Sequence, residues 1–241
     1  MEFTYDAYSN MIIKLKDKGY SFSGYEESYK FSKCVILRHD IDYSIDKAVE
    51  LANLEYKLGI KSTYFVLLSS PFYNIISNPI AERLRKISAL GHDIGLHFDE
   101  MNYDKDYYAK NGGVKNVVLN EIRLMEQILK MEIKSVSMHR PSKETLEANY
   151  SFGKIVNSYG HEFFKSYKYI SDSRKRWREN IDEIIELNKF DKLHILTHAF
   201  WYNYVNETIE ETISKFIADA IEDRYNMLND NISDLEEIVK K

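Results

Sequence analysis

The chain has 241 residues, of which 44% are hydrophobic and 29% charged, a composition typical of a globular protein large enough for one α/β domain. Its formal net charge of -5 argues against a dedicated nucleic-acid binder, whose surface would be basic. No stretch rich in proline, glycine and serine divides the sequence, so we expect residues 1–241 to form a single domain.

The N-terminus and the cysteine count indicate a cellular compartment. The first residues lack the cationic start and apolar core of a signal peptide, and no run reaches the roughly 18 apolar residues of a membrane span. The single cysteine, Cys34, lies in an apolar run and excludes internal disulfide bonds. We therefore expect a cytoplasmic protein without membrane insertion.

Apolar runs that resemble buried strands alternate along the chain with segments of helical periodicity. In chain order, the expected strands are 34–37, 62–68, 93–97, 135–138, 163–169 and 193–196, and the expected helices are 46–58, 79–90, 114–131, 145–159 and 180–187. Glycines directly after several of these helices are typical of helix ends. Such repeated alternation predicts a parallel sheet.

The last segment, residues 206–241, is predicted to be almost wholly helical. Thr208 and Glu211 form a capping box at its start, and Asp230-Asn231 is a predicted break. An apolar stripe at spacings of four and three runs through Ile221, Tyr225, Leu228, Ile232, Leu235 and Val239. The stripe fits either a helix that forms a homodimer or one that packs across the side of the main domain.

The most informative stretch is Arg38-His39-Asp40-Ile41-Asp42, which directly follows the first apolar strand. On an extended backbone Asp40 and Asp42 point to one face and His39 to the other. Two neighbouring carboxylates repel unless a cation lies beside them, and a divalent metal is the usual cation. The alternative is a pair of aspartates that cap the helix beginning near Ser44.

Histidines follow four of the predicted strands: His39, His97, His139 and His198. In a barrel, the carboxyl ends of parallel strands form one rim, and that rim carries the active site. Core histidines scattered at random are not expected to fall at strand exits four times. The pattern therefore favours a metal site over helix capping.

The ordered clusters resemble the polysaccharide deacetylases of carbohydrate esterase family 4 over about residues 33–201. More narrowly, they resemble the members with an Arg-His-Asp-x-Asp start that are associated with surface-polysaccharide biosynthesis. Segments 91–97, 140–142 and 193–198 are similar to the front of the second motif, part of the third and the fifth. The resemblance implies a distorted (β/α) barrel of about seven parallel strands, with 206–241 as an added C-terminal helical extension.

The same resemblance implies catalytic roles for three residues. Asp40 would be the general base, Arg140 would orient it, and His198 would be the general acid. Asp42 and His97 would be metal ligands. Zinc is the expected metal, with cobalt and nickel as alternatives.

A second metal histidine is expected four residues after His97, but that position is Met101. A thioether is a poor ligand for the metals used in hydrolysis. His139 is the first candidate for the missing ligand because it follows a different strand on the same rim. Asp99 is the alternative because it lies close to His97 in sequence, and Glu100 is a further candidate.

Expected substrate contacts are Trp201, Asp172 and Arg174. The tryptophan could stack on a sugar ring or belong to the core, and the aspartate could contact substrate or cap a helix. The arginine belongs to a cationic segment that could meet a phosphate. The implied function is metal-dependent N-deacetylation of an acetamido sugar, a nucleotide- or lipid-linked precursor in surface-polysaccharide biosynthesis. Alternatives are hydrolysis of a non-sugar amide and non-catalytic sugar binding.

Overall fold

The structure is a computed structural model that describes residues 1–239. The chain divides into two compact units, Met1–Tyr204 and Val205–Lys241, and we describe each by itself. Lys240 and Lys241, the last two residues of the predicted C-terminal extension, lie outside the described residues.

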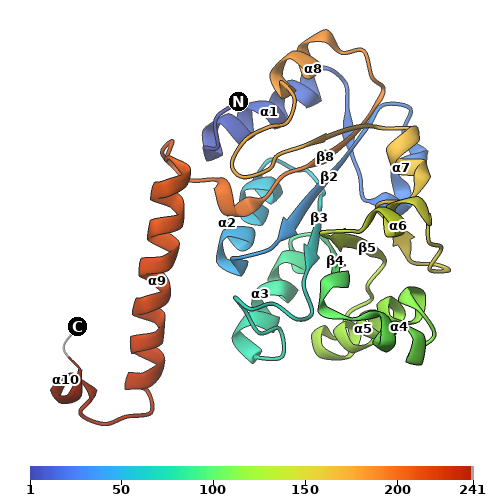
Figure 1. Cartoon of the computed structure of the whole chain (residues 1–241). Helices are drawn as coiled ribbons and strands as arrows, with labels where there is room; N and C mark the ends of the chain where they lie inside the picture. Colours follow the sequence, from blue (N-terminus) through green and yellow to red (C-terminus); the bar gives the residue numbers. More distant parts are fainter. Residues whose placement is uncertain (240–241) are drawn as a thin grey trace. The chain divides into compact units, whose positions relative to one another are not determined.

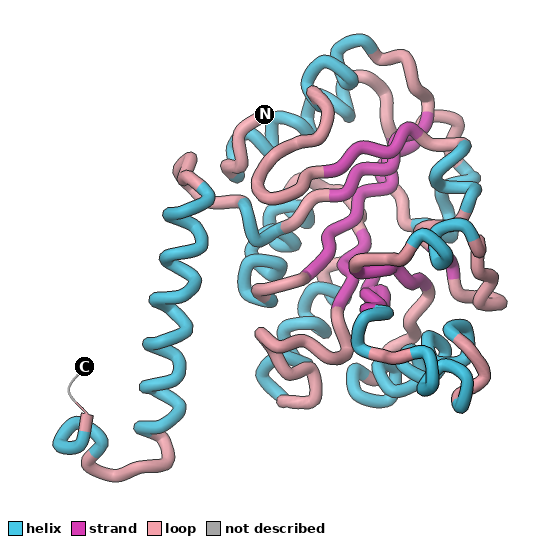
Figure 2. The backbone as a smooth tube through the Cα atoms, in the orientation of Figure 1, coloured by secondary structure: helices cyan, strands magenta, loops and turns pink. Residues whose placement is uncertain are grey.

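The first unit is built on one parallel sheet with the strand order β6-β5-β4-β3-β2-β8-β7 and with β1 beside the start of β2. The sheet curls into an incomplete barrel with helices around it (Figures 1 and 2). This confirms the predicted distorted (β/α) barrel. The strands are β1 (Ser21–Phe22), β2 (Cys34–Ile41), β3 (Thr63–Val66), β4 (Asp93–Asp99), β5 (Ser135–His139), β6 (Val156–Asn157), β7 (Lys168–Ser171) and β8 (Lys192–Leu196).

Helices connect the strands and cover the sheet, as the predicted alternation requires. The helix after β2 begins at Ser44, whose side chain accepts a hydrogen bond from the backbone N–H of Lys47. The helices of this unit are α1 (Tyr5–Asp17), α2 (Ile45–Lys57), α3 (Asn78–Ala89), α4 (Lys105–Lys110), α5 (Val114–Leu129), α6 (Lys143–Glu147), α7 (His161–Lys165) and α8 (Ile181–Leu187), with 3₁₀ turns η1 (Tyr25–Lys30), η2 (Glu100–Asn102) and η3 (Ala199–Trp201).

Two predicted elements are wrong in part. The expected helix 145–159 stops after α6 because Asn149 and Gly153 adopt positive φ values of 45° and 74°, which no right-handed helix accommodates. The start of the expected strand 163–169 is helix α7, because a short apolar run reads alike in either structure.

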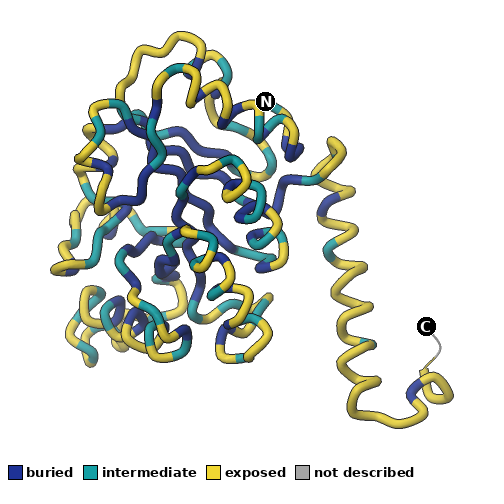
Figure 3. Tube along the Cα trace, turned by 180° about the vertical axis from the view of Figure 1, so that it is seen from behind, coloured by how far each residue is buried: buried dark blue, intermediate teal, exposed yellow. Residues whose placement is uncertain are grey.

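The side chains of Ile36, Arg38 and Asp40 all lie on the inner face of β2, because every second residue of a strand points to the same side. Ile36 packs in an apolar cluster, whereas Arg38 and Asp40 are charged. The strands form the buried centre of the unit (Figure 3). The charged pair of Arg38 and Asp40 therefore lies toward the carboxyl end of this face. The apolar cluster at the other end contains Tyr25, Ile36, Phe65, Phe163 and Tyr167.

The outer face of β2 carries a separate buried network around His39 and Glu55 of α2. His39 Nδ1 donates to the carbonyl oxygen of Thr197 at 3.0 Å, and its Nε2 lies 2.8 Å from Glu55 Oε1. Burial raises the pKa of Glu55, but the neighbouring His39 outweighs it and lowers the pKa to about 2. His39 thus lies apart from the other strand-end histidines. Three hydroxyl groups also donate to Glu55, those of Tyr8, Ser62 and Tyr64.

The second unit contains α9 (Ile209–Asn229) and α10 (Leu235–Ile238). The predicted capping box of Thr208 and Glu211 is confirmed, and α9 ends just before the predicted break at Asp230-Asn231. Among the described residues, no helix is both long and apolar enough to cross a membrane.

Candidate active site

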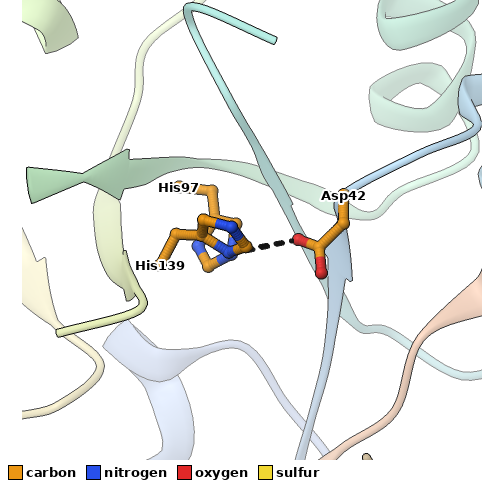
Figure 4. Close-up of side chains that lie close together, drawn as sticks. All are labelled: Asp42, His97 and His139. Carbon is orange, nitrogen blue, oxygen red and sulfur yellow. Dashed lines mark hydrogen bonds and ion pairs between the residues drawn. The ribbon is translucent and has the colours of Figure 1, made fainter. Parts of the chain in front are cut away.

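Three side chains meet where β2, β4 and β5 end. Asp42 directly follows β2, His97 lies near the end of β4, and His139 is the last residue of β5. Asp42 Oδ1 lies 3.3 Å from His97 Nε2 and 3.4 Å from His139 Nδ1, and the two imidazole nitrogens are 3.1 Å apart. Figure 4 shows both rings turned toward the Asp42 carboxylate.

This cluster fits a divalent metal. Ligands about 2.0–2.2 Å from a shared ion are themselves about 3–3.5 Å apart, which matches the three donor distances. Asp42 Oδ1 is buried and accepts no hydrogen bond from the described residues. A carboxylate with two imidazoles is a donor set that zinc favours. Met101 is 68% exposed and takes no part in the cluster.

Below this cluster, Asp40 is paired with Arg38 in the barrel interior. Arg38 Nη2 and Nε donate to the two carboxylate oxygens at 2.7 and 3.2 Å, and neither residue is more than 5% exposed. Burial raises the pKa of Asp40, but the guanidinium outweighs it and holds the pKa well below its usual range. The other contacts of Arg38 are the hydroxyls of Ser137 and Ser158 and the rings of Phe65 and Tyr159.

The pairing of Arg38 was readable from the sequence, since residues two apart on a strand share a face. Arg140, the expected partner of Asp40, instead pairs with Asp99. The arginine that contacts Asp40 therefore lies on the same strand, β2.

His198 approaches Asp42 from the end of β8. Its Nε2 lies 3.6 Å from Asp42 Oδ2, and its Nδ1 is bonded to Asp172. The same aspartate accepts hydrogen bonds from the His198 N–H at 3.1 Å and the Thr197 hydroxyl at 2.6 Å. Burial lowers the pKa of His198, but Asp172 outweighs it and raises the pKa to about 9.

The two carboxylates proposed as alternatives to His139 are engaged elsewhere. Asp99 accepts from Arg140 and from the N–H of Met101, and Glu100 accepts from the N–H of Ser142. Arg140 has a left-handed φ of 49°, which is uncommon for a residue with a side chain. These bonds hold the turn that follows His139.

A cavity of about 930 Å³ opens beside the cluster. None of the three expected substrate contacts lines it: Asp172 is buried behind His198, Trp201 is buried, and Arg174 lies exposed on a loop. The lining residues include Asp42 and His139 from the cluster, Asp99, Asn102 and Arg140 near it, and Tyr43 with the loop residues 67–74 and Ile76 on the other side.

Glu121 of α5 is buried near this wall and accepts a hydrogen bond from Tyr103. Burial raises its pKa to about 7, against the lowering effect of that bond. A carboxyl group with a raised pKa in the folded state destabilises the fold as pH increases from about 4.5 to 7. Glu121→Gln is therefore expected to increase the free energy of unfolding at pH 8 by up to about 3 kcal/mol.

Urea denaturation of the Glu121→Gln variant at pH 5 and pH 8 measures this effect. Glu144→Gln, an exposed site on α6, is the matched control and should change stability at neither pH. An equal stability of wild type and Glu121→Gln at pH 8 would contradict the prediction.

Comparison with known proteins yields matches to structures only: no family model and no curated protein matches the sequence. A family 4 carbohydrate esterase from Bacillus anthracis shares 15% identity, with 90% of this chain and 86% of that chain covered and a TM-score of 0.44. The Streptococcus pyogenes deacetylase PplD shares 15%, with 80% of each chain covered and a TM-score of 0.46. A CE4 family pseudoenzyme from Bacillus anthracis shares 11%, with 78% and 62% covered and a TM-score of 0.43. At such low similarity, function has to be argued from the residues of the site.

Proposed function

We propose that this protein is a metal-dependent hydrolase that removes the N-acetyl group from an acetamido sugar. The observation that carries the proposal is the cluster of Asp42, His97 and His139, with two separately held acid–base groups beside it. Those groups are Asp40, paired with Arg38, and His198, paired with Asp172. Metal-dependent amide hydrolysis can use such a combination of a metal site, a base and an acid.

The metal ligands in this proposal are Asp42, His97 and His139, with zinc as the best fit and cobalt or nickel as alternatives. A divalent cation, when bound, polarises the acetyl carbonyl and lowers the pKa of nearby water to about 7. In this ligand set, His139 takes the place of the histidine that the family resemblance leads one to expect at position 101.

Asp40 is the proposed general base. Its Oδ2 lies 3.6 Å from His97 Nε2, so the carboxylate borders the proposed metal site, where it could accept a proton from the attacking water. Arg38 fixes the carboxylate with two hydrogen bonds, and we assign to Arg38 the orienting role that the family resemblance implied for Arg140. The proton removed from the water passes to Asp40 as the new C–O bond forms.

His198 is the proposed general acid. Asp172 holds its Nδ1, which leaves Nε2 facing the site, 3.6 Å from Asp42 Oδ2. As the C–N bond breaks, His198 donates a proton to the departing amine. The products are acetate and a free amino sugar.

An acetamido sugar is favoured over a smaller amide by the walls of the cavity. Phe72, which is 51% exposed, and Tyr43 both line it. Aromatic rings pack well against the apolar face of a sugar. The cavity volume of about 930 Å³ also exceeds what an acetamide alone would fill.

The test is metal analysis of the purified protein followed by measurement of acetate release. Zinc, cobalt and nickel are added separately to metal-free protein, with acetamido sugars and non-sugar acetamides as substrates. We expect release from at least one sugar. Release only from non-sugar amides would replace the substrate class, and no release with any metal would refute the hydrolase.

His139→Ala is expected to weaken zinc affinity by at least about 10-fold, because loss of a ligand costs no less than loss of a residue that supports one. Competition with a chromogenic chelator measures the affinity without any substrate. Met101→Leu is the control, because Met101 is exposed and away from the cluster. Equal affinity in wild type and His139→Ala would remove His139 from the ligand set.

A further inference from the structure

Arg140 lies on the cavity wall, directly after His139, and its side chain is 61% exposed. Its Nη2 donates to Asp99. Within the described part of the chain, its Nε and Nη1 donate to no acceptor. Since Arg38 already holds Asp40, the catalytic machinery proposed above does not need Arg140.

Arg140 is the cationic side chain of the cavity, and two of its three guanidinium nitrogens are directed at no described acceptor. It is the one lysine or arginine among the residues that line this cavity. The two lining aspartates are both engaged, because Asp42 belongs to the proposed metal site and Asp99 is bonded to Arg140 and Met101. An anion that enters here would meet Nε and Nη1 of a guanidinium whose Nη2 is bonded to Asp99.

The backbone conformation of Arg140 is uncommon for a residue with a side chain. Arg140 keeps its left-handed φ of 49° although its side chain makes that conformation unfavourable. Glu100 fixes the turn that follows through the N–H of Ser142. Such locally strained residues persist where surrounding contacts hold them, and they cluster at ligand-binding positions.

We propose that Arg140 binds an oxyanion on the substrate, a phosphate or a carboxylate, so that the substrate is an anionic acetamido sugar. Because Arg140 follows the ligand residue His139, the anionic group lies on the acetamido sugar itself or on the group bonded to it. The statement that the substrate carries an acetamido group rests on the proposed function. The statement that it carries an anionic group rests on Arg140.

Isothermal titration of zinc-loaded protein tests the inference with three sugars. These are N-acetylglucosamine 1-phosphate, N-acetylglucosaminuronic acid and the neutral methyl glycoside of N-acetylglucosamine. We expect one anionic sugar to bind at least about tenfold more tightly than the neutral one, as for a charge-assisted hydrogen bond. The first two sugars distinguish phosphate from carboxylate. Inorganic phosphate alone measures anion binding to zinc.

Arg140→Gln is expected to bring the affinity ratio of anionic to neutral sugar close to one, and Arg140→Lys to keep part of it. The ratio is informative because general damage to the metal site weakens both sugars together. Asp99→Asn is the matched control: it removes the charge paired with Arg140 but keeps the arginine, so the ratio should be maintained or increase.

The inference is overturned if wild type binds neutral and anionic sugars equally, or if Arg140→Gln keeps the ratio. An anion preference that depends on Arg140, without acetate release from any compound, would refute the hydrolase and leave the inference intact. Acetate release without any anion preference would refute the inference alone.

Discussion

Asp40→Asn is expected to lower the rate of acetate release by about 10²- to 10⁴-fold, because an amide cannot accept the proton of the attacking water. Zinc content should stay close to that of wild type, since Asp40 lies outside the set of Asp42, His97 and His139. Turnover measured together with metal content tests both statements. Full activity in this variant would exclude Asp40 as the base.

Loss of activity in Asp40→Asn could also come from misfolding, because the substitution leaves the guanidinium of Arg38 buried without its counter-charge. The double variant Arg38→Met, Asp40→Asn removes both charges. It should fold and bind zinc yet remain inactive. Activity in the folded double variant would contradict the proposed chemistry as clearly as activity in the single one.

Arg38→Met alone is expected to reduce the free energy of unfolding by about 3–5 kcal/mol, the usual cost of breaking a buried ion pair from one side. Arg38 is fully buried, so no water can replace its bonds to Asp40. Chemical denaturation measures the loss. Arg123→Met, an exposed site on α5, is the control and should be nearly neutral.

The double variant also shows whether the loss of stability in Arg38→Met comes from leaving the charge of Asp40 unpaired. If the cost arises from an unpaired buried charge, Arg38→Met, Asp40→Asn will be more stable than Arg38→Met. If the two costs simply add, the residues are not coupled and the proposed orientation of Asp40 by Arg38 loses its basis.

Part of this site could be predicted from sequence because its residues end parallel strands. Asp42, His97 and His139 each come near or just after a strand's carboxyl end, and parallel pairing brings those ends to one edge. The face on which Asp40 lies follows from strand alternation. The alternation of strands and helical segments predicts the parallel sheet, and the family resemblance adds the barrel.

The remaining contacts depend on tertiary geometry that no local pattern carries. The bond between Asp172 and His198 joins two adjacent strand ends, and sequence alone gives Asp172 several equally good partners. Arg140 pairs with Asp99 because a left-handed backbone turn redirects its side chain, and an arginine has no intrinsic preference for that turn. The prediction of a helix at 145–159 was wrong for a similar reason, because Asn149 and Gly153 adopt left-handed conformations that the sequence pattern does not indicate.

The origin of the three proposed metal ligands on separate strands couples metal binding to folding. His97 and His139 are 42 residues apart, so the unfolded chain does not hold this ligand set together. The ion would therefore bind almost entirely to the assembled sheet. At a free concentration 100 times its dissociation constant, it would stabilise the folded protein by about 2.7 kcal/mol. Cellular metal supply would then set how much of this chain is folded as well as how much is active.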